Sequence, residues 1–148
     1  MSYCNLSDIQ KRLSTQEITR LVADSGVVPD FEDPDDPGLA LVSAAITSAS
    51  TEIDFACSLR YPVPLSPIPA RIVDICVDIS IYNLFKRRFR EMPEAIAKQY
   101  DDAKKELAEI SKGNRVLGVT MPEDDSSSSG IVVSKTASDK TYDLDRFL

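Results

Sequence analysis

The side chains best able to do chemistry in this sequence are carboxylates, because its 148 residues include no histidine. Histidine is the commonest general base and the commonest transition-metal ligand, so its absence removes both roles. Asp74 and Asp78 stand four residues apart in an apolar stretch, and Arg71 precedes Asp74 by three. A catalytic carboxylate pair needs two different environments and a polar cleft. With an arginine one helical turn away, we expect ion pairing there and no catalytic site.

A second group of carboxylates lies in the run Ser25–Gly38, which holds three prolines and five acids between Asp30 and Asp36. A calcium loop of the EF-hand type needs alternating oxygen ligands, glycine at its sixth position and glutamate at its twelfth. Counted from Asp30, those positions hold Asp35 and Leu41, and prolines interrupt the frame. We therefore expect a solvated acidic loop, with no metal and no cofactor.

The nucleophilic side chains lack the surroundings that catalysis requires. Cys4, Cys57 and Cys76 show neither metal spacing nor a CxxC pair, and the latter two fall in apolar helical patterns. We expect these thiols to be buried and reduced. The run Ser126–Ser129 has no Gly-x-Ser-x-Gly frame, and the scattered glycines form no phosphate-binding loop. The sequence thus predicts a protein that is not an enzyme.

Basic side chains gather at Lys86, Arg87, Arg88 and Arg90. They could contact DNA phosphates or an acidic partner. The alternative, which we favour, is a solvated helix end, where cations suit the negative end of the helix dipole. The net charge of −7 also argues against nonspecific electrostatic binding of nucleic acid over a large surface.

The spacing of apolar residues predicts an all-α fold, a compact bundle of two short and three long helices. Ser7 with Gln10, and Ser14 with Glu17, are typical of capping boxes that open the two short helices. Small residues dominate the middle of the first long helix, so a neighbour could approach it closely. The long helices are expected at Leu39 to about Leu59, Pro67 to about Phe89, and Pro93 to about Lys112, with Gly113 as a stop.

The second long helix is apolar on more than half its circumference, so we expect it to contact neighbours on two sides. Charges at Arg71, Asp74 and Asp78 argue against a membrane span in this stretch. The start of the chain lacks the basic and apolar regions of a signal peptide. These features indicate a reducing, aqueous compartment.

Residues 1–113 are predicted to form the helical domain, and residues 114–148 a linker and docking arm. Pro122–Gly130 is a flexible linker by composition, and the extended arm after it can hold short β-strands. Such an arm cannot build a core alone. We expect its apolar residues to dock on this subunit or another; they include Tyr142, Leu144, Phe147 and Leu148.

A set of short motifs runs along the helical domain. They are Glu52-Ile53-Asp54, Arg60-Tyr61 with Pro64-Leu65, Asp78-Ile79 with Tyr82 and Leu84, and Tyr100, Ala103, Leu107 and Ile110–Gly113. In these motifs the chain resembles the Mu-like prophage family of small proteins encoded among the head genes, often labelled only a domain of unknown function. The resemblance covers residues 3–113 well and Thr141–Leu148 loosely, and Pro29–Pro37 departs from the more glycine-rich acidic loop of relatives.

That family is in turn similar to the helical head–tail connector (adaptor) proteins of long-tailed phages. The resemblance implies a homo-oligomeric ring of about twelve copies below the portal protein, in contact with a tail-completion or stopper protein. Genomic DNA would pass through the lumen without specific binding. The implied location is the neck of the virion, after assembly in the host cytoplasm and without a membrane. A soluble helical regulator or nucleic-acid-binding module using Lys86–Arg90 is the alternative.

Overall fold

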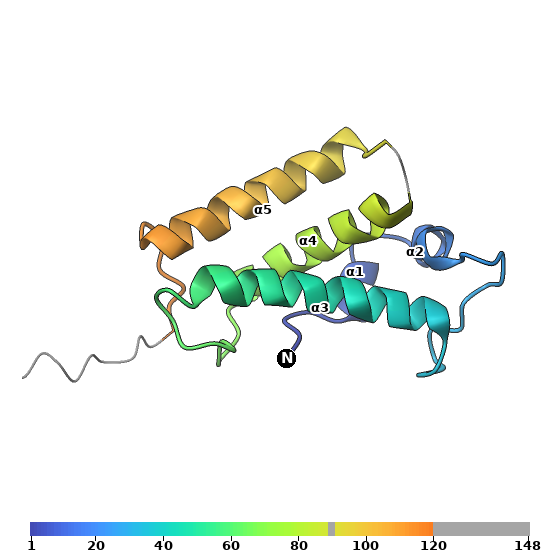
Figure 1. The fold of residues 1–148 in the computed structure, drawn as a ribbon, viewed down its shortest axis with the longest axis horizontal. Helices are drawn as coiled ribbons and strands as arrows, with labels where there is room; N and C mark the ends of the chain where they lie inside the picture. The colour runs from blue at the N-terminus through green and yellow to red at the C-terminus, as the bar shows by residue number, and fades with distance from the viewer. Residues whose placement is uncertain (89–90, 120–148) are drawn as a thin grey trace, which may run out of the picture.

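The computed structural model describes residues 1–88 and 91–119, which form an all-helical domain (Figure 1). The predicted two short and three long helices are confirmed, and the described residues contain no strand. Arg90, the linker and the arm, with Tyr142, Leu144, Phe147, Leu148 and any strands there, lie outside the described residues. The helices are α1 (Leu6–Gln10), α2 (Thr15–Val22), α3 (Pro37–Cys57), α4 (Ala70–Arg88) and α5 (Glu94–Lys112).

Both short helices open with capping boxes, but only one of the two predicted boxes is correct. Ser14 and Glu17 cap α2 as expected. In α1 the cap is Asn5, whose side chain accepts a hydrogen bond from the Asp8 amide at 3.1 Å, while Asp8 reaches back to the Asn5 amide. Asparagine caps helices as well as serine does. The helix therefore starts two residues earlier than the Ser7 box predicts.

The first long helix also begins earlier than its apolar pattern predicts. One Asp36 carboxylate oxygen accepts hydrogen bonds from the amides of Gly38, at 2.7 Å, and Leu39, at 3.3 Å. Pro37 stands at the first helical position, where its missing amide proton costs nothing. A residue of the acidic loop thus serves as the helix cap.

The second long helix begins at Ala70, three residues after the predicted start at Pro67. Because a proline disfavours helical backbone in the residue before it, Pro69 excludes Ile68 from the helix. The first helical hydrogen bonds accordingly run from the amides of Ile72 and Val73 to the Pro69 carbonyl. The predicted start rests on Pro67 as the first helical residue and neglects the effect of Pro69 on the residue before it.

The centre of the bundle is α4, which lies between α3 and α5 (Figure 1) and also contacts α1 and α2. Ile72, Ile75 and Ile79 are fully buried along its length. Its buried hydroxyl, Ser80, donates to the Cys76 carbonyl at 2.7 Å, so burial leaves no orphaned polar group there. The prediction that this helix buries surface on two sides is confirmed.

Candidate interaction surfaces

The carboxylates Asp74 and Asp78 join helices and do not form a pair of catalytic type. Arg12, which follows α1, donates to Asp74 at 3.0 Å and also to Asp78. The predicted Arg71–Asp74 pair is only marginal, at 3.9 Å, because Arg71 binds Glu106 of α5 with an Nε–Oε2 distance of 2.9 Å. This guanidinium holds the pKa of Glu106 below its usual range. Both arginines therefore tie α4 to its neighbours.

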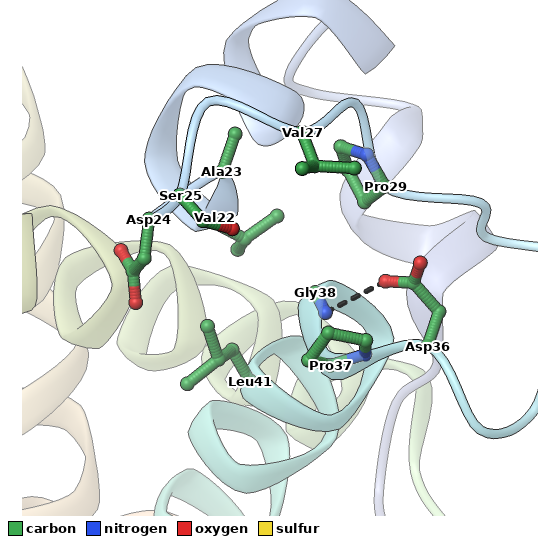
Figure 2. A pocket seen from close by; sticks show the side chains of 10 residues that line it. All are labelled: Val22, Ala23, Asp24, Ser25, Val27, Pro29, Asp36, Pro37, Gly38 and Leu41. Carbon is green, nitrogen blue, oxygen red and sulfur yellow. Dashed lines mark hydrogen bonds between the residues drawn. The ribbon is translucent and has the colours of Figure 1, made fainter.

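The acidic loop uses its carboxylates on its own backbone (Figure 2). Besides capping α3, Asp36 accepts from the Asp30 amide at 2.9 Å, and Asp33 accepts from the Asp35 amide at 3.0 Å. The pocket beside the loop, lined by Val22 and Leu41 among others, has a volume of about 80 Å³. Small-molecule pockets usually measure about 300–1,000 Å³, so a sizeable ligand would not fit. Among the described residues, no cluster of histidine, cysteine and carboxylate side chains could hold a metal ion.

Cys57 and Cys76 are buried free thiols, as predicted, and Cys4 is a third. Burial raises the pKa of Cys57 to about 11, which removes the thiolate that a nucleophile needs. The Sγ atoms of Cys4 and Cys76 lie 3.1 Å apart in the interior, beside the hydroxyl of Ser80. These thiols pack the N-terminal segment onto α4.

The basic cluster at the end of α4 is partly engaged within the domain. Arg87 and Arg88 both donate to Asp24, which follows α2, at 3.0 Å and 2.8 Å. These side chains are partly exposed, so the pairing adds little stability. It nevertheless fixes two guanidinium groups against a carboxylate of the same chain. Lys86 is exposed.

The exposed residues of α3 are all uncharged. The two acids of the helix, Glu52 and Asp54, are half-buried and bind Lys104 and Tyr3. Thr47 and Thr51 donate their hydroxyl hydrogens to the carbonyls one turn back, those of Ser43 and Thr47, both at 2.9 Å. A partner could therefore cover this face without stripping water from a charged group. The exposed residues of the helix are Pro37, Ala40, Ser43, Ala44, Thr47, Ser48, Thr51 and Phe55.

By length and composition α3, and not α4, is the helix that could cross a membrane. This is weak evidence, because a core helix of a soluble protein meets the same criteria. The opposite face of α3 supplies Val42, Ile46, Ala49 and Ile53 to the interior, which accounts for its apolar composition. The outward face of α5 differs sharply, with mostly charged residues that include Lys98, Asp101, Asp102 and Lys105.

Large apolar side chains are exposed where α3 ends. Phe55, in the last turn of α3, is 83% exposed, and Leu59, two residues after the end of the helix, is 75% exposed. Val63 in the proline-rich turn and Val116 after α5 are exposed at the same end of the domain. We call Phe55, Leu59, Val63 and Val116 the apolar end patch. Exposed apolar clusters of this kind commonly mark interaction sites.

The apolar end patch rests on a well-tied support. Arg60 donates to the carbonyls of Ser111 and Lys112 at 3.2 Å and 2.8 Å, which satisfies the C-terminus of α5. The Leu117 amide donates to the hydroxyl of the buried Tyr61 at 3.2 Å. The chain after α5 is thereby held against the turn after α3.

Gly113 provides a test of this support. Its φ of +82° suits glycine, and an added Cβ would collide with the Arg60 guanidinium group. Gly118 also has a positive φ, +70°, but open space around it. We expect Gly113→Ala to lower the free energy of unfolding by more than Gly118→Ala, for which backbone strain alone costs about 1–2 kcal/mol. Urea denaturation measures both, and equal losses would mean that the Arg60 contact is unimportant.

Sequence reasoning missed Phe55 and Leu59. Their signal was present, since both are large apolar residues that lie off the buried stripe of their helix. The stripe instead contains Val42, Ile46 and Ile53. Large apolar residues that fall off the buried stripe of a predicted helix are therefore the sequence signal of an exposed apolar surface.

The described residues form a helical domain with an uncharged exposed face on α3 and a mostly charged one on α5. The chain belongs to a family described as bacteriophage Mu, Gp36, whose model matches residues 3–135. It is therefore a phage protein, and the resemblance to a Mu-like phage family is confirmed. No curated protein matches the sequence.

Proposed function

We propose that this chain is a structural head–tail connector (adaptor) subunit, which forms a ring below the portal protein through which DNA passes. The tail-completion or stopper protein would bind the other side of the ring, in the virion neck. Membership of a Mu phage family supports this proposal. The mechanism is assembly, without turnover.

The observation that carries the proposal is the uncharged outward face of α3. A ring subunit must repeat one contact with each neighbour, which requires a surface that dehydrates at little cost. The α3 face spans about 30 Å, and apart from Phe55 at its end the exposed residues are small or already hydrogen-bonded. The charged face of α5 suits the opposite role, contact with water or with the lumen. The whole chain carries a net charge of −7, which disfavours a strong hold on DNA phosphates.

A matched pair of alanines tests this assignment. Ala44 on α3 and Ala108 on α5 are both exposed positions in helix interiors. We expect the full chain to form rings on the portal, and Ala44→Arg to abolish them because it buries a charge in the contact. Ala108→Arg should leave them intact. Negative-stain images and particle mass of mixtures with the portal measure the outcome.

Two results would contradict the proposal. One is a chain that stays monomeric and binds neither portal nor stopper. The other is an Ala44→Arg variant that assembles as well as Ala108→Arg, which would remove the α3 face from the contact.

The alternative, a regulator or nucleic-acid-binding module using Lys86–Arg90, makes a different prediction. Because Arg87 and Arg88 face Asp24 and the chain is acidic, we expect no retardation of DNA in gels even at low salt. Retardation that vanishes when Arg87, Arg88 and Arg90 become alanine, and persists in Lys98→Ala with Lys105→Ala, would favour the alternative.

A further inference from the structure

We propose that the apolar end patch binds the C-terminal segment Tyr142–Leu148 of a neighbouring copy of this chain. The proposal rests on the connector function, for which it names a contact that joins successive subunits. Three properties favour this segment as the ligand of the patch: its apolar residues, its charge, and the length of chain that precedes it.

The patch is exposed, and the segment is rich in large apolar residues. Phe55 and Leu59 project from the end of α3 at 83% and 75% exposure, held on a support that Arg60 and Tyr61 fix. The segment Tyr-Asp-Leu-Asp-Arg-Phe-Leu alternates apolar and charged residues over its first half. Extended chain with that alternation presents apolar side chains on one side, which suits a narrow exposed patch.

Charge selects this patch over the other exposed apolar site of the described residues. Arg60, beside Leu59, donates to two carbonyls, and no carboxylate of the described residues pairs with it. The segment brings Asp143 and Asp145. The competing site, Val27 and Val28, lies next to the acidic loop, whose carboxylates would repel those aspartates.

Reach favours a neighbouring copy. The described chain stops at Val119, at the same end of the domain as the patch (Figure 1). Residues 120–141 separate it from the segment and can span about 75 Å when extended, more than twice the length of α3. A return to its own patch would need only a few residues. The length of the chain instead matches a site on the next subunit of a ring.

Photo-cross-linking of the full chain tests the contact directly. Phe147 is replaced by p-benzoylphenylalanine, and ¹⁵N-labelled and unlabelled copies are mixed and assembled on the portal before irradiation. We expect cross-linked peptides that join position 147 to residues 55–63 of a differently labelled copy. Phe55→Ser with Leu59→Ser should lower the yield about tenfold or more, through loss of two apolar contacts. Val27→Ser with Val28→Ser is the matched control and should leave the yield unchanged.

Ring formation is measured by negative-stain images and the contact by the cross-link. The connector proposal and the docking proposal can therefore be contradicted separately. Rings with cross-links elsewhere, or only within one chain, would overturn the docking proposal and leave the connector function standing. A chain that forms no ring and binds no portal overturns both. Because Phe55 and Leu59 are exposed, their replacement should preserve the helical circular dichroism, which shows that a lost cross-link does not reflect unfolding.

Discussion

Replacing Ile75 by alanine is expected to lower the free energy of unfolding by roughly 2–5 kcal/mol. Ile75 is fully buried in α4, the helix that contacts every other helix of the bundle. The change removes the apolar surface of the side chain and leaves a cavity that its neighbours fill only in part. Small domains have unfolding free energies of about 5–15 kcal/mol, so this single change can remove much of the stability of the domain.

Ile96→Ala is the matched control for this prediction. Ile96 is also in a helix, α5, but it is only partly buried against the core. The helix propensities of the two exchanges are the same, so the difference reports burial. Urea denaturation followed by circular dichroism gives both free energies. Equal costs would contradict the central position of α4.

The long helices could be predicted from the sequence because their signals are local. Pro93 and Gly113 mark the ends of α5, and Ser14 with Glu17 marks the start of α2. The errors arose where two local signals competed. Asn5 took the cap assigned to Ser7, and Pro69 delayed the helix that Pro67 was expected to open.

Contacts between elements were much harder to predict, because they depend on where the helices meet. The spacing correctly placed Arg71 near Asp74, but Glu106 of α5 lies closer to Arg71 in the fold. The pairing of Arg87 with Asp24 joins residues 63 positions apart, and no periodicity points to it. The candidate surfaces were the hardest feature to predict, because the exposure of a residue depends on how all the helices pack.

The two outward faces of the domain suit different roles in the proposed ring: contact between subunits, and exposure to water. The α3 face is uncharged and ends in the apolar end patch, whereas the α5 face is charged. Contact between copies through α3 would bury surface that water solvates weakly and leave the charges of α5 hydrated. The reverse arrangement would have to dehydrate the charges of α5.

Tyr3→Phe is also expected to lower the free energy of unfolding strongly. The Tyr3 hydroxyl donates to the Asp54 carboxylate and accepts from the Leu65 amide at 2.9 Å, while its own amide donates to Ser50 at 3.1 Å. One residue thus joins the N-terminal segment, α3 and the proline-rich turn. Loss of the hydroxyl leaves a carboxylate and an amide short of a partner, at a cost of about 2–4 kcal/mol. Tyr61→Phe should cost less, since that hydroxyl has a single, longer bond to Leu117.

The pH dependence distinguishes this network from simple loss of packing. Burial, together with the hydrogen bond to Asp54, raises the pKa of Tyr3 well above its usual value. The folded chain therefore holds the phenolic proton more tightly than the unfolded chain, in which tyrosine titrates near pH 10. This contribution to stability is fully present below about pH 10 and is lost as the pH rises further. The gap in unfolding free energy between the wild type and Tyr3→Phe should hence narrow in alkaline solution, with Tyr61→Phe as the control. A gap that stays constant from pH 7 to about 11 would show that the hydroxyl is not held as the structure describes.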